Sequence, residues 1–371
     1  MNTINDILHT QSTAESRWAR LGPYYAMFPL EFAFKTVEEY SKEGDFIIDP
    51  FAGKFSSIFA GSVTGRKGVG IEINPVGWLY GKAKINPASM EKILEKLKFI
   101  YQKRNNYKKT MENMPAFYRF CFCDDVLKFL LSARKNLQWE RYKVDATLMS
   151  IILVYLHGKI GQSLSNQMKM TKAMGMNYSI NWWKEKNMET PPEINPYEFL
   201  KSRIEWRYEK GLPQTESETE TILGDSTKKL LNMVKTNQNK FSLLFTSPPY
   251  CSVTDYYSDQ WLRYWMLGGV GNPLSLREKH KDRFNNKVEY SNLLNSVFES
   301  CSYLMKQKST IYVRTDIRQF TLETTIDVLK RNFPNHKMHK RLANVDKRTQ
   351  TDIMGNSSLK RGEIDIIMQR K

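Results

Sequence analysis

Residues 46–53 read Phe46-Ile47-Ile48-Asp49-Pro50-Phe51-Ala52-Gly53, and this stretch decides the fold. Its first apolar residues fit a short buried strand, and the Asp-Pro pair and the glycine after them fit a tight turn. Residues 56–63 then have the apolar spacing of a helix, and residues 68–71 have the composition of a second strand that ends at Glu72. The spacing predicts a strand–helix–strand unit of about 30 residues, the building block of a parallel sheet.

The same alternation returns in the C-terminal part of the chain. Strands are predicted there at residues 242–245, 309–314 and 363–368, and helices at residues 290–306 and 322–331. A further helix is predicted at residues 28–44, before the first strand. Such alternation is typical of an α/β fold with a mostly parallel, doubly wound sheet. Because ligands of such sheets bind at the carboxyl ends of the strands, the residues that follow each strand form the candidate site.

The stretch between these two parts has a different composition. Residues 81–120 hold ten Lys or Arg and three Asp or Glu, and apolar residues recur there at helical spacing from Met90 to Tyr101. Residues 145–157 are apolar with a helical pattern, and residues 158–183 are polar and rich in Met. We therefore predict three regions: residues 1–80, an inserted and mainly helical region at 81–215, and residues 216–371, which complete the sheet.

The 371-residue chain has a formal net charge of +17. An excess of this size indicates a polyanionic partner, with nucleic acid as the leading candidate; the alternative is ordinary solubility or a bias of the host's composition. The four cysteines lack the spacing of a zinc site or a disulfide framework, so we expect no metal and a reducing cytoplasm. An apolar signal segment and a run of about 18 apolar residues are both lacking, so no membrane span is expected.

A second motif, Thr246-Ser247-Pro248-Pro249-Tyr250, leaves a predicted strand about 200 residues after the first. The Ser247 hydroxyl and the Pro248 carbonyl are hydrogen-bond acceptors, and the prolines fix the backbone that carries them. Such acceptors favour a pyramidal nitrogen on an exocyclic amine, whose lone pair is otherwise delocalised into the base. Tyr250 offers a ring on which a flipped base can stack. An isolated Pro-Pro-Tyr would instead be a turn with a packed tyrosine; the apolar strand before it and the first motif favour catalysis.

The first motif has the features of a nucleotide-type cofactor site. Gly53 lets the backbone approach a ligand, and the helix that follows directs its N-terminus at that ligand. Glu72 ends the second strand, where an acidic side chain can accept hydrogen bonds from ribose hydroxyls. Without other signals, the alternative is a generic α/β turn with a solvent-facing Glu72.

The chain resembles the amino-group DNA methyltransferases, which use S-adenosylmethionine (SAM), in four ordered motifs: Phe28-Pro29, Asp49-Pro50-Phe51-Ala52-Gly53, Glu72-Ile73-Asn74-Pro75 and Ser247-Pro248-Pro249-Tyr250. The resemblance covers most of residues 20–80 and 221–370. It implies a class I SAM-methyltransferase-like α/β fold. In that fold residues 1–80 are the cofactor-binding half, residues 81–215 the helical target-recognition region, and residues 216–371 the catalytic half.

The resemblance also implies roles for single residues. Phe28 and Pro29 lie near the methionine moiety of the cofactor, and Glu72 meets the ribose, with Ile73 and Asn74 beside it. Asp225 and Ser226, at the third strand end, lie near the adenine ring; the alternative is a simple helix N-cap. The cofactor is lined by Asp49, Pro50, Phe51, Ala52 and Gly53, and catalysis falls to Ser247, Pro248, Pro249 and Tyr250.

One residue departs from the family pattern. A second glycine usually follows two residues after Gly53, where this chain has Phe55. The ring must be housed, so we expect either a displaced turn or a lowered affinity for the cofactor. The hydroxyls of Ser56 and Ser57 remain at the start of the helix, where they can cap it.

The resemblance implies a site-specific methyltransferase that acts on a flipped base of double-stranded DNA. Its context would be a restriction-modification or related defence system, with a cognate restriction endonuclease for the same site. Ser247 favours cytosine N4 over adenine N6, and the chain has no Pro-Cys dipeptide of the kind that carbon-5 methylation of cytosine needs. Two other classes stay open, a methyltransferase of structured RNA and a non-catalytic DNA-binding relative.

The sequence also offers candidate contacts outside the motifs. Lys side chains neutralise phosphates, and Asn and Gln read base edges, which suits a polar loop made of Ser165, Asn166, Gln167, Lys169 and Lys172. The lysine-rich helix before it is either a DNA-binding face or a solvated one. Residues 337–361 form a second basic stretch suited to brace a duplex. After the catalytic motif, Asp259 or Arg263 is a candidate for the pocket, whereas Trp261 and Trp265 are expected in the core.

Overall fold

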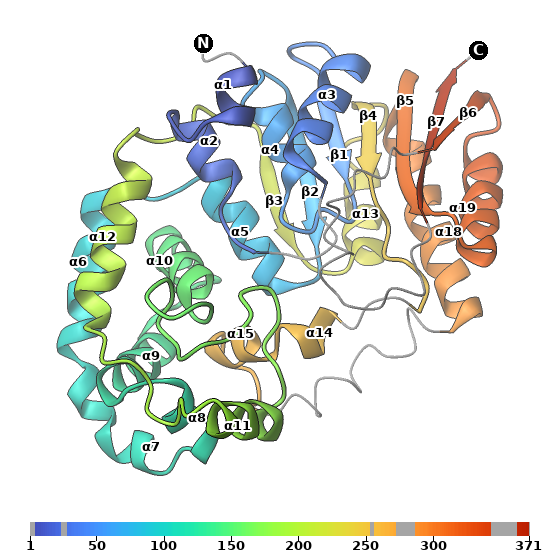
Figure 1. The fold of residues 1–371 in the computed structure, drawn as a ribbon. Coiled ribbons are helices and arrows are strands. Elements are labelled where there is room, and N and C mark those ends of the chain that lie inside the picture. The colour runs from blue at the N-terminus through green and yellow to red at the C-terminus, as the bar shows by residue number, and fades with distance from the viewer. Residues whose placement is uncertain (1–3, 24–27, 253–255, 272–285, 343–361, 371) are drawn as a thin grey trace. The chain divides into compact units, whose positions relative to one another are not determined.

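A computed structural model describes residues 4–23, 28–252, 256–271, 286–342 and 362–370. The chain divides into two compact units (Figure 1). The sheet unit comprises Tyr25–Gly81, Gln214–Thr254 and His280–Lys371. The helical unit comprises Met1–Tyr24, Lys82–Pro213 and Asp255–Lys279.

The sheet unit is built on a seven-stranded sheet with the order β3-β2-β1-β4-β5-β7-β6. Only β7 runs antiparallel to its neighbours in the described part of this sheet. The fold is therefore the mostly parallel α/β, class I SAM-methyltransferase-like fold that the sequence predicts. The strands are β1 (Phe46–Asp49), β2 (Lys67–Glu72), β3 (Glu220–Leu223), β4 (Phe241–Thr246), β5 (Met305–Asp316), β6 (His336–Leu342) and β7 (Glu363–Arg370).

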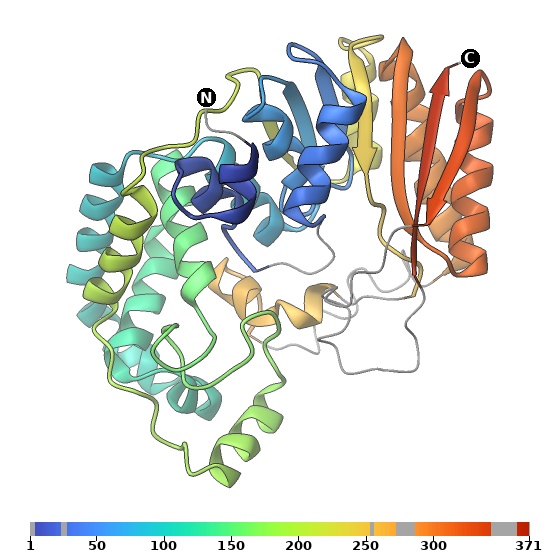
Figure 2. The ribbon, with the colours of Figure 1, turned by 45° about the horizontal axis from the view of Figure 1, so that its top comes forward.

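Helices cover both faces of this sheet, so it is doubly wound. Successive residues of a strand point to opposite faces, and Ile48, Leu244 and Ile311 face a core formed with helices α13, α18 and α19. On the other face Phe245 and Tyr312 contact Phe32 of α3, which packs on α4 (Figure 2). The helices of this unit are α3 (Leu30–Tyr40), α4 (Ser56–Ser62), α13 (Ser226–Val234), α18 (Lys287–Leu304) and α19 (Gln319–Asn332). Helix α5 (Pro75–Ile85) carries the chain from one unit into the other.

The strand order places the two sequence motifs side by side. From β1 the chain turns to β2 and β3 on one side, and β4 and β5 lie on the other side, so β1 and β4 form the switch point of the sheet. Ile47 pairs with Leu243 and Ile48 with Leu244 in parallel register. The turn after β1 and the motif after β4 therefore leave the sheet at the same edge, where ligands of such sheets bind.

The helical unit contains the other helices, which are α1 (Ile4–His9), α2 (Ala14–Ala19), α6 (Met90–Gln102), η1 (Arg104–Tyr107), α7 (Lys108–Glu112), α8 (Ala116–Cys121), α9 (Asp124–Asn136), α10 (Lys143–Tyr155), α11 (Met176–Glu185), α12 (Pro196–Tyr208), α14 (Tyr256–Asp259) and α15 (Trp261–Met266). Helix α6 buries a stripe of Ile93, Leu97 and Ile100, as its periodicity predicts; Lys92 and Lys98 are exposed, and Lys96 is half-buried. Helix α10 is apolar and buried along most of its length, which fits its place in the core. No helix within the described ranges is long and apolar enough to cross a membrane.

Two elements differ from the sequence prediction. The first long helix, α3, begins at Leu30 and ends at Tyr40, because Pro29 takes an extended conformation as its N-cap. Strand β6 was expected only as part of a basic stretch. Its side chains are mostly exposed on both faces, so it lacks the alternating pattern of a half-buried strand. The rest of that stretch, residues 343–361, lies outside the described residues.

Candidate active site in the sheet unit

The buried Asp49 carboxylate joins the two sequence motifs. It ends β1 and accepts a hydrogen bond of 2.6 Å from the hydroxyl of Thr246, the residue that ends β4. It also accepts hydrogen bonds from the Ser57 hydroxyl and from the Phe51 amide, the latter 3.1 Å long. Burial raises the pKa of Asp49 to about 6, although these donors act in the opposite direction. The turn after β1 is thus anchored both to its own helix and to the strand of the catalytic motif.

Glu72, at the end of β2, closes the same turn from the other side. One carboxylate oxygen accepts from the Gly53 amide at 2.7 Å, and the other accepts from the Asn74 amide at 2.7 Å. Gly53 has φ +53°, a conformation that glycine adopts readily. Burial raises the pKa of Glu72 to about 7. The sequence left open a solvent-facing Glu72, and the structure shows a buried one.

Phe55 is housed in the core beside this turn. Its φ is +63° and its side chain is completely buried. The ring occupies space that two glycines leave: a β carbon added to Gly70 would lie 2.5 Å from the ring, and one added to Gly81 would lie 2.1 Å from it. Because these separations are far below van der Waals contact, the chain needs both glycines beside this ring. The structure thus shows Phe55 in a matching space beneath the turn.

The third strand end is tied to the first. Asp225 caps α13 by accepting from the Thr227 amide at 3.0 Å, as the simpler prediction had it. Ser226 donates its hydroxyl to the Pro50 carbonyl. Asn74 accepts from the Val76 amide at 2.9 Å, and its buried Nδ2 has no hydrogen-bond partner among the described residues. A buried donor without an acceptor is costly, so it is a point where a polar ligand fits.

The aromatic residue of the first family motif lies against β4. The Phe28 ring stacks on Phe245 with the ring centroids 4.4 Å apart, and it also contacts Phe32 at 5.2 Å. Pro29 is exposed and precedes α3. Phe245 is the residue before Thr246, which ends β4 and begins the catalytic motif. Phe28 therefore lies close to that motif.

The catalytic motif continues from β4 without regular structure. Pro248 is buried, whereas Ser247, Pro249 and Tyr250 are half-buried. The Tyr250 hydroxyl donates a 2.8 Å hydrogen bond to Glu363 at the start of β7. After the motif, the Cys251 carbonyl accepts from Arg318 at 2.7 Å. Cys251 itself is buried, which fits a packing role.

The predicted cofactor-binding and catalytic residues all lie in the sheet unit, at or after the ends of β1, β2, β3 and β4 or just before α3. The residues fit a SAM-type cofactor on three observations: a glycine turn with positive φ, a carboxylate aimed at that turn, and a buried amide donor without an acceptor. Sequence reasoning gave no role to Thr246 or Glu363. It expected Ser56 and Ser57 to cap the helix, but α4 has no side-chain cap hydrogen bond at its N-cap, and the Ser57 hydroxyl donates to Asp49 instead. Thr246 and Ser57 carried a signal, since both adjoin quoted motifs; Glu363 carried none, because only the sheet topology brings it there.

Three candidates of the helical unit have structural roles. Arg263 is fully buried and donates to the carbonyls of Leu153 at 3.0 Å and Met170 at 2.7 Å, so the prediction that it faces a pocket is wrong. Ser165 and Asn166 are also fully buried, and Asn166 donates to the Phe120 and Met188 carbonyls. They therefore cannot read base edges as the sequence suggested.

The remaining polar candidates of that loop differ among themselves. Asp259 is mostly buried and forms a 2.6 Å ion pair with Lys172. Gln167 accepts from the Ile160 amide at 3.1 Å, and Lys169 is exposed. Trp261 and Trp265 are buried in the core, as predicted.

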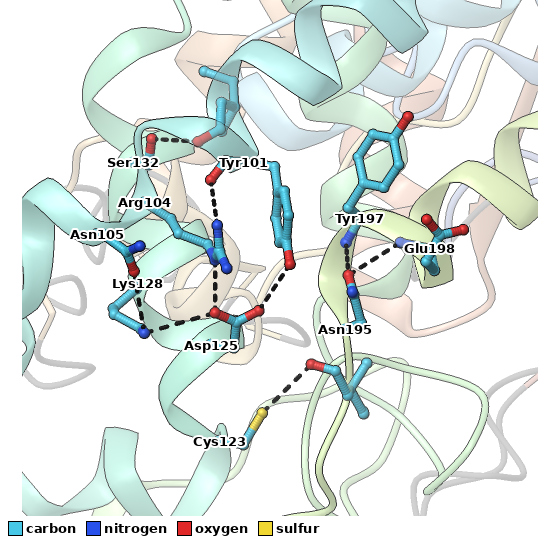
Figure 3. Close-up of polar contacts among 12 residues, drawn as sticks. Tyr101, Arg104, Asn105, Cys123, Asp125, Lys128, Ser132, Asn195, Tyr197 and Glu198 are labelled. Atoms are coloured by element: carbon cyan, nitrogen blue, oxygen red, sulfur yellow. Dashed lines mark hydrogen bonds and ion pairs between the residues drawn. The ribbon is translucent and has the colours of Figure 1, made fainter.

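Some cations of the insertion are neutralised within it (Figure 3). Arg104 lies over the Tyr101 ring, 3.7 Å from its centroid, and donates to Asp125 at 2.6 Å. Lys128 approaches the same carboxylate at 3.6 Å, and the Tyr101 hydroxyl donates to it. These groups link α6, η1 and α9, so they stabilise the helical unit and are poorly placed to bind phosphates. Within the described residues, no group of three or more acidic, His or Cys side chains has the arrangement of a metal site.

Comparison with known proteins finds similarity to methyltransferases. A family model described as DNA methylase, of N6 and N4 methyltransferases, matches residues 2–76. Two curated type II methyltransferases are similar. M.MthZI of Methanothermobacter thermautotrophicus is 28% identical over 89 residues, which is 22% of this chain and 25% of that protein. M.BsoBI of Geobacillus stearothermophilus is 27% identical over 274 residues, which is 68% of this chain and 52% of that protein.

The chain therefore spans about half, or less, of the length of these relatives. Among solved structures, the rRNA methyltransferase aviRa from Streptomyces viridochromogenes matches over 100% of this chain and 94% of its own. Its sequence identity is 10% and its TM-score 0.35, which is too low to support a functional argument.

Proposed function

We propose that the chain transfers a methyl group from SAM to the N4 amine of a cytosine in double-stranded DNA. Its similarity to the N6 and N4 DNA methylases and to type II methyltransferases supports this proposal. The observation that carries the proposal is the hydrogen bond between Asp49 and Thr246. It ties the cofactor motif to the strand that bears the catalytic motif, at the switch point of the sheet. This link between the two motifs supports a methyl transfer at that edge of the sheet.

The cofactor would be held by the turn after β1 and by the ends of β2 and β3. When bound, SAM supplies a methyl group on a sulfonium cation. The ionised Glu72 would accept hydrogen bonds from the ribose hydroxyls, with Ile73 and Asn74 beside it. Phe28 and Pro29 would border the methionine moiety, and Asp225 and Ser226 the adenine ring. The turn itself, from Asp49 through Gly53, would line the cofactor.

The catalytic motif would act on the target amine. The Ser247 hydroxyl and the Pro248 carbonyl accept its two protons in hydrogen bonds, which strengthen as the nitrogen becomes pyramidal. Pro248 and Pro249 limit backbone motion, so the acceptors are organised before the reaction. Tyr250 stacks on the flipped base. No covalent bond between protein and base is needed, which agrees with the burial of Cys251.

Target recognition falls to residues 81–215 in this proposal. The net charge of +17 favours DNA as the partner. We also propose a restriction-modification or related defence role, with a cognate endonuclease for the same site; the similarity to type II methyltransferases supports it. Phe55 raised the alternative of a non-catalytic relative; its ring is accommodated while Gly53 and Glu72 remain hydrogen-bonded, which favours a working cofactor site.

The test is to identify the product. The protein is incubated with radiolabelled SAM and duplex DNA, structured RNA or buffer, and the digested nucleic acid is analysed by mass spectrometry. We expect N4-methylcytosine in DNA only, and none from Ser247→Ala at equal SAM affinity. N6-methyladenine would keep the mechanism and change the base; 5-methylcytosine or labelled RNA alone would contradict the proposal.

A further inference from the structure

The antiparallel strand β7 brings acidic residues to the catalytic edge of the sheet. Because β7 runs opposite to β5, its first residues lie beside the last residues of β5: Glu363 pairs with Asp316 and Asp365 with Arg314. Alternate residues of a strand share a face, so Glu363 and Asp365 lie on the same side of the sheet. Topology alone thus places a carboxylate, Glu363, next to the end of the catalytic motif.

A firmly held arginine lies beside this carboxylate. Arg314 donates to both oxygens of the buried Asp365, at 2.7 and 3.0 Å, and approaches Glu363 at 3.7 Å. Its guanidinium also lies 3.5 Å from the centroid of the Phe32 ring. Paired hydrogen bonds of this kind hold the planar guanidinium in one orientation. The remaining Glu363 oxygen accepts the hydroxyl of Tyr250 at 2.8 Å.

We propose that Glu363 is a positioning residue, which holds the Tyr250 hydroxyl so that the ring keeps the orientation needed to stack on the target base. The inference rests on the proposed function. A tyrosine ring anchored at its hydroxyl loses little freedom when a base arrives, so stacking is organised beforehand. Arg314 supports this role indirectly, because it keeps Glu363 in place.

A double-mutant cycle tests the role. Tyr250→Phe removes the hydroxyl and keeps the ring, and Glu363→Ala removes its acceptor. We expect each to lower kcat about tenfold with unchanged SAM affinity, and the double variant to be no slower than either single one. Glu363→Gln, which keeps an acceptor oxygen, should restore most of the activity. Glu31→Gln, which removes an exposed ion pair with Lys35, is the matched control.

The outcomes separate the inference from its premise. A wild-type protein that methylates no DNA contradicts the proposed function. An active wild type in which Glu363→Ala has no effect, or has its full effect in the Tyr250→Phe background, overturns the positioning role. Fluorescence of 2-aminopurine at the target position gives a second readout, since poor stacking leaves the flipped base brighter than in the wild type.

A separate observation concerns α11 in the helical unit. Figures 1 and 2 show this helix at the periphery of the unit, and its main packing partner is α8. It is fixed along one side only. Trp183 is buried, donates its indole NH to the Gln167 carbonyl at 2.8 Å and contacts the Phe117 ring. The Asn166 amide secures the segment after the helix by donating to Met188 at 2.7 Å.

The opposite side of α11 carries amide side chains to solvent. Asn177, Asn181 and Lys184 are exposed and follow each other at intervals of four and three residues, so they share one face. Tyr178 beside them is 58% exposed. Asparagine is a poor helix former, so two of them in ten residues weaken the helix that Trp183 anchors. Residues 158–188 hold five lysines against one glutamate, a charge that suits a polyanion.

We propose that α11 enters the major groove of duplex DNA and that Asn177 and Asn181 read base edges there; this also rests on the proposed function. An Asn side chain makes two hydrogen bonds to an adenine edge in the major groove. Residues four apart on a helix are separated by about 6 Å along its axis. Base pairs two steps apart in a duplex are separated by about 7 Å, so the two side chains could reach base pairs of one short site. Exposed lysines of the same segment would meet the phosphates.

The test uses Asn177→Ala/Asn181→Ala and a randomised plasmid library whose methylated positions are sequenced. We expect discrimination to fall by roughly 10- to 100-fold at one or two positions of the site, with unchanged affinity for random duplex. Asn232→Ala, an exposed asparagine on α13, is the matched control. Unchanged site preference in an active double variant, or an equal loss of affinity for every duplex, would overturn the assignment.

Discussion

Glu72 links proton binding to cofactor binding. Burial raises its pKa to about 7, so near pH 6 the carboxyl is mostly protonated and accepts ribose hydrogen bonds poorly. We expect SAM affinity to rise between pH 6 and pH 8 and binding near pH 7 to release a proton, measured by calorimetry in buffers of different ionisation enthalpy. Glu72→Ala should weaken binding by about 1–3 kcal/mol and abolish this pH dependence. A pH-independent affinity in the wild type would contradict a ribose contact through Glu72.

The same shift has a consequence for stability. The folded state holds the Glu72 proton to higher pH than the unfolded state does, so this group favours folding at low pH. Its contribution is present below the unfolded pKa and is lost as the pH rises towards 7. Denaturant titrations at several pH values between the ordinary pKa of 4.5 and about 7 should test this. Over that pH range the free energy of unfolding should fall less in Glu72→Gln than in the wild type.

Phe55, which stands where the family pattern has a glycine, requires glycines at the positions that border its ring. Gly81 lies in a helix, where alanine is normally better by about 0.5–1 kcal/mol. Here a β carbon would collide with the Phe55 ring, so Gly81→Ala should destabilise the protein by about 1–3 kcal/mol. In a Phe55→Ala background the cost should disappear. Thermal unfolding of the four proteins measures this coupling, and equal costs in both backgrounds would show that the ring is not responsible.

A hydroxyl–carboxylate hydrogen bond joins β1 and β4 at each end. The one far from the catalytic edge is a control for the one at that edge. Thr246 donates to Asp49 at the carboxyl ends, and Ser242 donates to Asp45 at 2.7 Å near their beginnings. We expect Thr246→Val to cost about 1–2 kcal/mol of stability and to weaken SAM binding, because a buried carboxylate loses a donor beside the turn. Ser242→Ala should leave SAM affinity unchanged. Equal effects of both variants on SAM affinity would mean that the link at the catalytic edge has no special role.

The sequence predicted the features whose signals lie within a few neighbouring residues, and it missed those that depend on contacts between distant residues. The strand–turn–helix of residues 46–62 was readable because apolar strand, proline and glycine lie within a few residues of one another. Strand β6 was not, because its exposed side chains give no alternation, and its only described strand partner, β7, is distant in sequence. Glu363 was missed for the same reason, since it reaches Tyr250 through strand pairing across more than a hundred residues. Arg263 and Asn166 were misread because polarity in a sequence does not reveal burial.

The excess of positive charge over the whole chain predicts that its affinity for DNA depends strongly on salt. Each phosphate contact adds about 0.9 to the slope of log affinity against log salt, so six contacts would give a slope near −5. We expect a slope of that order in a titration of duplex DNA from about 50 to 200 mM salt. Lys184→Ala/Lys186→Ala, on the exposed side of α11 and just after it, should reduce the slope by up to about 2. Arg104→Ala should leave it unchanged, because Arg104 is already paired with Asp125. A slope near zero in the wild type would contradict phosphate contacts, and an unchanged slope in Lys184→Ala/Lys186→Ala would place the contacts away from α11.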